Sequence, residues 1–155
     1  MTDDSVSDAL TVRRAAATDL ALIAPLFDAY RVFYGQASDL AGAHAFLSQR
    51  LESRESVIFL AQLGSVPAGF TQLYPAFTST GLRRIWLLND LYVAPEARRR
   101  GVSTALLEAA RQHGLETGAA RLVLTTDKEN LPAQASYQAH GWQRDERYFT
   151  YELDL

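Results

Sequence analysis

The fold is decided by one stretch of sequence, Arg84-Ile85-Trp86-Leu87-Leu88-Asn89-Asp90-Leu91-Tyr92-Val93 followed by Ala94-Pro95-Glu96-Ala97-Arg98-Arg99-Arg100-Gly101-Val102-Ser103. Its first half is too continuously apolar for a half-exposed strand, which predicts a central strand covered on both faces. Pro95 ends that strand, and apolar residues then recur at helical spacing over residues 102–117. The stretch therefore predicts a buried strand, a turn with three arginines and a glycine, and an amphipathic helix.

The segments on either side fit a single mixed sheet. Before the central strand we expect a strand, two helices and a hairpin, over residues 10–16, 19–35, 39–53, 57–63 and 69–74. Thr18 is the expected N-cap of the first helix. After the central helix we expect a strand, a helix and two aromatic-rich strands, over residues 121–126, 132–140, 141–143 and 147–153. This order of elements predicts an α+β, or mixed α/β, fold with one sheet. Residues 1–8 are expected to form a flexible tail, and residues 9–155 a single domain.

Composition excludes several classes of function. The chain has no cysteine, which rules out a disulfide framework, a thiolate nucleophile and a cysteine-based zinc site. Its net charge of −3 is unlike that of a nucleic-acid-binding domain. We find no long apolar run and no basic leader, so we expect a cytoplasmic protein that does not interact with membranes. The three dispersed histidines, His44, His113 and His140, are expected to be structural, and we expect no metal site.

The turn at residues 98–103 has the features of a phosphate site. The first N–H groups of a helix lack internal partners and lie at the positive end of its dipole, so they bind anions. Gly101 would allow close approach of the backbone, and the neighbouring arginines would add positive charge. A diphosphate would fit this arrangement. The alternative is that Arg98, Arg99 and Arg100 form only a solvated run of charge.

The segment Arg98-Arg99-Arg100-Gly101-Val102-Ser103 resembles the acyl-CoA signature of the GNAT acyltransferases: Gln or Arg, two residues, Gly, one residue, then Gly or Ala. Ser103 departs from the last position. The resemblance covers about residues 86–142 and includes Asn89-Asp90-Leu91-Tyr92-Val93, Asn130, Tyr137 and His140-Gly141-Trp142. It implies a central, mostly antiparallel sheet with a splayed pair of parallel strands and about four flanking helices.

The resemblance also implies acetyl-CoA as cofactor, with pantetheine lying in the splay like an added strand. The amide N–H of Leu91 would donate to the thioester carbonyl. The implied cofactor-binding residues are Leu91, Tyr92, Val93, Arg98, Arg99, Arg100, Gly101, Val102, Ser103, Thr104, Asn130, Ala133 and Tyr137.

Two residues are candidates for catalysis. By resemblance, Tyr137 would return a proton to the thiolate leaving group, although it could simply pack on the core. Asp90 is the nearest carboxylate to the expected cleft, and burial would raise its pKa and suit it to act as a base, directly or through water. Alternatively, Asp90 orients a loop by hydrogen bonding.

The acceptor is expected to be a primary amine. Tyr30, Tyr34, Tyr74 and Asp90 are the candidate acceptor-binding residues, whereas Phe33 and Phe77 could equally be core aromatics. Residues 30–34 and 70–75 resemble the GNAT branch that acetylates histones, polyamines and D-amino acids, which favours a small-molecule amine. The predicted function is direct acetyl transfer in a ternary complex, by an enzyme that we expect to be a homodimer by analogy with relatives. The alternatives are a coenzyme A-binding or nucleotide-binding regulatory module without catalysis, and a protein or peptide N-acetyltransferase.

Overall fold

The computed structural model describes residues 8–155. Within it the chain divides into two compact units, a sheet unit that ends at Leu124 and a C-terminal unit, Thr125–Leu155. Each is described by itself below. The expected tail at residues 1–8 lies, except for Asp8, outside the described residues, and the expected single domain over 9–155 stays a prediction.

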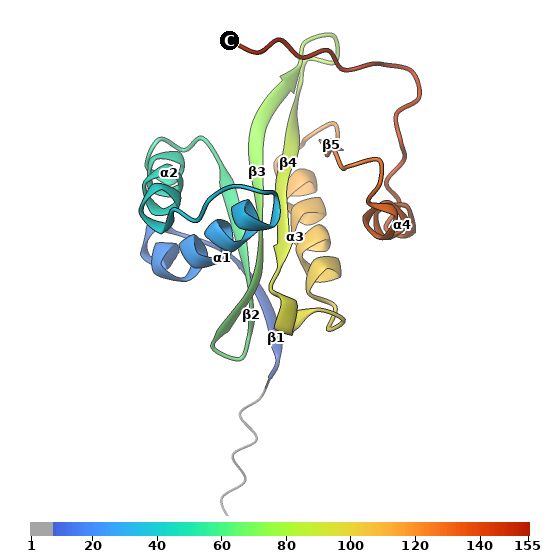
Figure 1. Ribbon diagram of the computed structural model, residues 1–155. Coiled ribbons are helices and arrows are strands. Elements are labelled where there is room, and N and C mark those ends of the chain that lie inside the picture. The colour runs from blue at the N-terminus through green and yellow to red at the C-terminus, as the bar shows by residue number, and fades with distance from the viewer. Residues whose placement is uncertain (1–7) are drawn as a thin grey trace, which may run out of the picture. The chain divides into compact units, whose positions relative to one another are not determined.

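The sheet unit is built on a five-stranded sheet with the strand order β1-β2-β3-β4-β5 (Figure 1). The first three neighbouring pairs are antiparallel and the β4–β5 pair is parallel, which confirms the expected α+β fold. The strands are β1 (Leu10–Arg14), β2 (Val57–Leu63), β3 (Val66–Thr78), β4 (Arg83–Val93) and β5 (Leu122–Val123). The helices of this unit are α1 (Leu20–Phe33), α2 (Leu40–Glu52) and α3 (Val102–Glu116), with short 3₁₀ turns at Ala17–Asp19 and Pro95–Ala97.

Helices cover both faces of the sheet. Phe70 of β3 packs against Phe27 and Tyr30 of α1, so the α1 helix covers this face. On the opposite face, Phe59 of β2 and Trp86 of β4 contact His113 of α3 (Figure 1). Because a strand alternates its side chains between the two faces, β3 and β4 present different residues to α1 and to α3.

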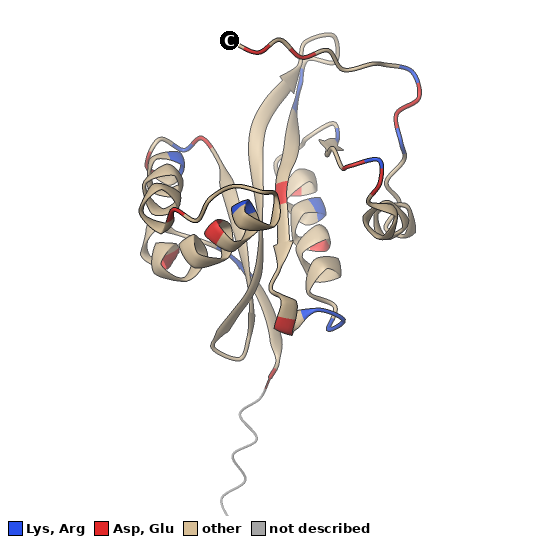
Figure 2. Ribbon diagram, in the orientation of Figure 1, with Lys and Arg blue, Asp and Glu red and all other residues tan. Residues whose placement is uncertain are grey.

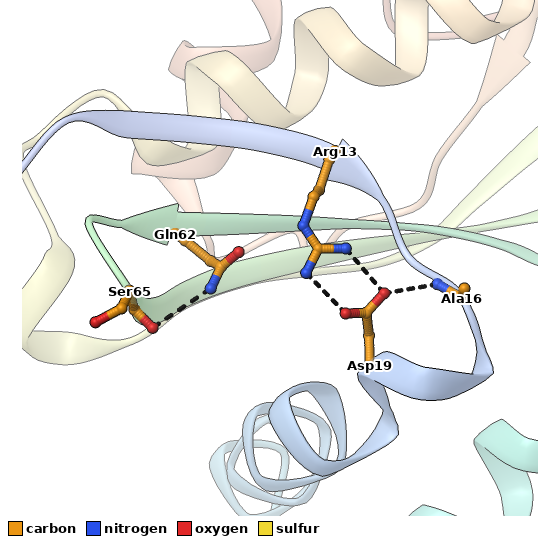
Figure 3. Close-up of polar contacts among 5 residues, drawn as sticks. All are labelled: Arg13, Ala16, Asp19, Gln62 and Ser65. Carbon is orange, nitrogen blue, oxygen red and sulfur yellow. Dashed lines mark hydrogen bonds and ion pairs between the residues drawn. The ribbon is translucent and has the colours of Figure 1, made fainter.

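The start of the first helix differs from the prediction. Thr18 is not its N-cap, because Thr18 lies inside the 3₁₀ turn Ala17–Asp19 and Asp19 occupies the N-cap position of α1 without a side-chain cap. The carboxylate of Asp19 accepts the N–H of Ala16, at the start of that turn, at 2.8 Å (Figure 3). Asp19 also receives two hydrogen bonds from Arg13, at 2.7 and 2.9 Å, which ties the end of β1 to the start of α1. These bonds hold the pKa of Asp19 below its usual value. The chain thus enters α1 through the 3₁₀ turn, and the bidentate pair with Arg13 fixes this turn to the end of β1.

The C-terminal unit contains α4 (Leu131–Ala139), but neither of the two strands expected after it. Residues 142–155 adopt no strand, and β5 spans two residues where six were expected. Tyr148, Phe149 and Tyr151 are exposed by 68%, 89% and 91%. A strand needs a neighbour for its backbone groups, and an alternating sequence alone does not supply one. Among the described residues, no helix is long and apolar enough to cross a membrane.

Candidate active site

Strand β4 has an edge that β5 does not cover. The parallel pairing runs from Trp86 with Leu122 to Leu87 with Val123 and ends there. Strand β4 continues to Val93, bonded along this length to β3. The edge of β4 over residues 88–93 is therefore open on the β5 side within the described part of the chain. An extended ligand could pair with such an edge as an added strand does, and Leu91, Tyr92 and Val93 lie on it.

The turn that follows β4 exposes the start of α3. Gly101 is the N-cap residue, has a φ of +77°, and makes no side-chain cap. The preceding Arg99 is also left-handed, with a φ of +63°, so the turn reverses within a few residues. No side chain of the described residues thus caps the first N–H groups of α3, at Val102, Ser103 and Thr104. Figure 2 shows this turn as a stretch of positive residues at the N-terminus of α3.

Within residues 8–155, Asp8 is the acidic residue that reaches the arginine turn. Asp8 lies 3.4 Å from an Nη atom of Arg100, and both side chains are largely solvated. Such an exposed pair contributes little to stability, so a stronger anion can displace it. Arg98 and Arg99 are exposed as well. The turn therefore presents exposed guanidinium groups beside unbonded helix amides, which is the geometry expected for a diphosphate site.

Gly69 of β3 sets the position of this helix end. A Cβ atom at this residue would lie 2.5 Å from the carbonyl oxygen of Tyr92 and 3.1 Å from Cγ1 of Val102. The absence of a side chain at Gly69 lets the first residue of α3 rest directly on the β3–β4 ladder. The helix N-terminus is thereby held beside the last residues of the open edge.

A β-bulge in β4 determines which way Asp90 points. Gln72 of β3 pairs with Asp90, but the next residue, Leu73, pairs with Leu88, so Asn89 is the extra residue. Strict alternation would place Asp90 on the same face as Leu88 and Trp86, toward α3. The bulge instead places it opposite Gln72, on the α1 face.

Asp90 is a buried carboxylate with 5% of its surface exposed. Its Oδ2 accepts a hydrogen bond of 2.8 Å from Gln72 Nε2, and its Oδ1 accepts one of 3.1 Å from Asn89. Burial raises the pKa of Asp90, and hydrogen bonds from Gln72, Tyr30 and Asn89 oppose that rise. Its side-chain partners lie on β3, on β4 and on α1. A carboxylate with a raised pKa is suited to accept a proton near neutral pH.

Tyr30 and Tyr74 lie close to this carboxylate, and Tyr34 packs on Tyr30. The rings of Tyr30 and Tyr34 are 5.0 Å apart edge to face, and Tyr30 is 6.1 Å from the ring of Tyr92. Burial, together with the charge of Asp90, raises the pKa of Tyr30 well above its ordinary value and that of Tyr74 to about 12. These hydroxyls stay protonated in the working range of pH. We call Asp90, Gln72, Tyr30, Tyr34 and Tyr74 the Asp90 cluster.

Gln72 is a member of this cluster that the sequence reasoning missed. Its side chain is fully buried, and Nε2 bridges Asp90 and the hydroxyl of Tyr74, at 2.8 and 3.1 Å. Its Oε1 is buried and has no hydrogen-bond partner among the described residues. The available signal was an uncharged polar residue inside an apolar strand, because such a residue is buried only when it is bonded.

The comparison with known protein families is decisive. A family model described as the acetyltransferase (GNAT) family matches residues 23–142. The chain belongs to the GNAT acetyltransferase family. GNAT enzymes are acyl-CoA N-acyltransferases, so this chain is an N-acetyltransferase of a family that uses acetyl-CoA.

Individual GNAT relatives agree with this assignment. The chain is 46% identical over 146 residues to an uncharacterized N-acetyltransferase, YhfO, of Bacillus subtilis, covering 94% of this chain and 98% of the relative. It superimposes on the crystal structure of a probable acetyltransferase with a TM-score of 0.89 and 42% identity, covering 94% and 97% of the two chains. It is also 27% identical over 111 residues to a thialysine N-epsilon-acetyltransferase of Caenorhabditis elegans, covering 70% and 69%.

Three of the expected GNAT site residues lie in the C-terminal unit. Asn130 is the N-cap of α4, and its Oδ1 accepts the N–H of Ala133 at 3.3 Å. Tyr137 lies in α4 with its ring 6.2 Å from that of Trp142. The backbone N–H of Trp142 donates to the backbone carbonyl of Tyr137. The cofactor contacts expected for Asn130, Ala133 and Tyr137 stay predictions.

Two aromatic residues near the expected acceptor region do not belong to the core. Phe33 and Phe77 are 63% and 68% exposed, so neither is a core residue. Phe33 packs edge to face against Tyr34 at the end of α1, and Arg84 lies over the ring of Phe77. Phe33 therefore extends the aromatic surface that begins at the Asp90 cluster.

Proposed function

We propose that the protein transfers the acetyl group of acetyl-CoA to the primary amine of a small molecule, by direct attack in a ternary complex. One observation carries the proposal: a buried carboxylate, Asp90, lies among tyrosines and next to the open edge of β4. A carboxylate with aromatic neighbours is suited to bind an ammonium group and then to remove its proton.

The chain's own residues then supply each step. The first amides of α3 and the arginine turn hold the cofactor diphosphate, and the open edge of β4 pairs with the pantetheine amides. Asp90 accepts a proton from the bound ammonium, directly or through water. The freed nitrogen attacks the thioester carbon while the N–H of Leu91 donates to the developing oxyanion. Collapse breaks the carbon–sulfur bond, and the hydroxyl of Tyr137 donates a proton to the departing thiolate. The second proton of the acceptor nitrogen is lost through water and restores the hydroxyl of Tyr137, and Asp90 releases the first proton to solvent.

A small acceptor is favoured over a folded protein. The thialysine acetyltransferase relative is named for an amino acid that carries a side-chain amine. The cluster offers the acceptor one buried carboxylate, with Tyr34 at its exposed side (58% exposed). This arrangement suits a single ammonium group entering between aromatic rings. We also propose a homodimer, supported by the exposed apolar side chains of residues 148–155 in the C-terminal unit.

Coenzyme A binding tests the cofactor half of the proposal. We expect the triple variant Arg98→Gln, Arg99→Gln, Arg100→Gln to bind coenzyme A at least a hundredfold more weakly, because the loss of one or two hydrogen bonds to charged groups, at about 1.5–3 kcal/mol each, already has this effect. Binding of pantetheine, which has no diphosphate, should not change. Isothermal titration calorimetry measures both. Arg111→Gln is the matched control, since Arg111 is an exposed arginine elsewhere on α3. Equal affinity of the triple variant and the wild type would contradict the assignment of the turn.

An amine panel distinguishes the functional alternatives. Lysine-like amino acids, polyamines, aminoglycosides and peptides are incubated with acetyl-CoA, and the acetylated product is detected by mass spectrometry. We expect product from small amines. A binding module would bind coenzyme A and yield no product above the background of hydrolysis. A protein acetyltransferase would use peptides and leave free amines unmodified.

The Gln72→Met variant tests the role of the residue that holds Asp90. The Gln72 hydrogen bond lowers the pKa of Asp90, so removing it should raise that pKa further. Since Asp90 acts when ionised, activity increases as pH rises through its pKa, and the acid limb of kcat/KM should move to higher pH. The substitution should change kcat/KM less at high pH, where Asp90 is ionised in both proteins, than at pH values near the pKa of Asp90. Gln62→Met is the control, because Gln62 bonds only the carbonyl of Ser65 in the β2–β3 turn (Figure 3). An acid limb at the same pH in Gln72→Met would show that Gln72 does not position the base.

A further inference from the structure

A second cavity lies where β1, α2 and α3 end and β2 begins. It has a volume of about 500 Å³, and its lining includes Trp86 of β4, His113 of α3 and Pro75 of β3. Trp86 and His113 pack on each other with ring centroids 4.6 Å apart, on the face that α3 covers. Neither Asp90 nor the arginine turn contributes to this lining. Nothing in the proposed acetyl transfer uses this cavity.

Three arginines line the cavity without an acidic partner. They are Arg14 at the end of β1, Arg54 after α2 and Arg84 in β4, and no carboxylate of the described residues lies within ion-pair distance of any of them. Arg13, next to one of them, is paired with Asp19. The one acid in the lining, Glu52, accepts a hydrogen bond from Ser48 instead. The cavity therefore has an excess of positive charge in a chain whose net charge is −3.

Polar atoms in the same wall lack partners. Nε2 of His113 and Oγ of Ser56 are buried and have no hydrogen bond within residues 8–155, and these residues are 8% and 6% exposed. Buried polar groups of this kind are normally bonded, and an unsatisfied one calls for an absent partner. Burial, and secondarily the charge of Arg14, lower the pKa of His113, so the ring is neutral near pH 7. One of its nitrogens then carries a hydrogen and the other can accept one.

The guanidinium of Arg84 is held in place before any ligand arrives. It lies over the rings of Phe77 and Trp86, 4.9 and 5.2 Å from their centroids. Stacking leaves the N–H groups at the edge of the guanidinium free to bond an anion in its plane. Ordering a long side chain in advance also reduces the entropy lost on binding.

We propose that this cavity binds a small organic anion, with its carboxylate or phosphate group at Arg14 and Arg84 and its apolar part against Trp86 and Pro75. Arg54 and the hydroxyl of Ser56 complete the polar side. The site is separate from the cofactor turn because the two lie at opposite ends of α3, whose 15 residues span about 20 Å.

The two indole N–H groups of the chain provide a direct test. Trp86 lines the cavity and its Nε1 bonds Thr117, whereas Trp142 lies in the C-terminal unit. Inorganic phosphate, benzoate and phenyl phosphate are titrated into ¹⁵N-labelled protein near neutral pH at constant ionic strength. We expect a saturable shift of the Trp86 indole signal. Phenyl phosphate should bind more tightly than phosphate, because its ring can pack against Trp86 and Pro75. The probe with the higher affinity, benzoate or phenyl phosphate, shows whether the site prefers a carboxylate or a phosphate. The pKa of His113, followed by NMR, should rise when the anion offsets the field of Arg14.

Variants and competition decide the outcome. Arg84→Gln and Arg14→Gln should each weaken phenyl phosphate about tenfold or more, and Arg111→Gln should leave its affinity unchanged. Saturating coenzyme A should not prevent the Trp86 shift. Competition by coenzyme A would mean that the probes occupy the cofactor turn, and would overturn the proposal. Equal shifts at both tryptophans, or none in the wild type, would also overturn it and would leave the arginines to offset the C-terminal dipoles of α2 and α3.

Discussion

Replacing Asp90 with asparagine is expected to lower kcat/KM for acetyl transfer by about 10²–10⁴-fold, the usual contribution of a general base. Asparagine keeps the shape and can still accept from Gln72, so the fold should be retained, but it cannot take a proton. The acid limb of the pH profile, which lies above the ordinary aspartate value because burial raises the pKa of Asp90, should disappear. Steady-state rates over a range of pH, with the best amine of the panel, measure both effects.

A structural role for Asp90 makes a different prediction. If the carboxylate only joined β3, β4 and α1, Asp90→Asn would lower the free energy of unfolding and leave kcat/KM within a few-fold of the wild type. Urea unfolding of the same preparation measures the first quantity. Glu108→Gln is the control, because Glu108 is an exposed carboxylate on α3 that pairs only with Arg111. Affinity for coenzyme A should be the same in all three proteins.

Replacing Tyr137 with phenylalanine is expected to lower kcat by about 10²–10⁴-fold, with little change in the KM for acetyl-CoA. The substitution keeps the ring that lies near Trp142 and removes only the hydroxyl. A phenol with a pKa of about 10 can donate a proton to a thiolate whose conjugate acid has a pKa of about 8.5. Without it the thiolate leaves unprotonated, and the fall should be smaller for thioesters of more acidic thiols. Rates with a series of acetyl thioesters measure this dependence.

An unchanged kcat in Tyr137→Phe would remove the catalytic assignment and leave Tyr137 as a packing residue of α4. Tyr148→Phe is the control, since Tyr148 is an exposed tyrosine of the same unit. A fall in affinity for coenzyme A without a fall in kcat would instead indicate that the hydroxyl binds the cofactor and takes no part in proton transfer.

Local patterns in the sequence predicted most of the sheet unit. The continuous apolar run of residues 84–93 is a central strand between β3 and β5. Helical periodicity placed α3 within a residue of its observed end. The turn at Gly101 has the positive φ that the glycine allowed. These features depend on a few neighbouring residues, so they are visible in the sequence.

Other expectations failed because they depend on contacts between different elements of the fold. Thr18 lies inside a 3₁₀ turn, which the carboxylate of Asp19 joins to the N–H of Ala16 and to Arg13 of the preceding strand. The aromatic stretch at 147–153 has an alternating pattern, but no described strand pairs with it. Pattern alone gives the propensity for a strand, and the neighbour decides whether the strand forms.

The sequence by itself determined the strand, the arginine turn and the helix, because each follows from periodicity and from the conformational freedom of a single glycine. The tertiary structure decided the orientation of Asp90. Counted by alternation, its side chain belongs on the Trp86 face, and only the register between β3 and β4 shows that Asn89 bulges and turns Asp90 toward Tyr30 and Gln72. A bulge arises from how two strands fit together, so neither strand's sequence contains it alone.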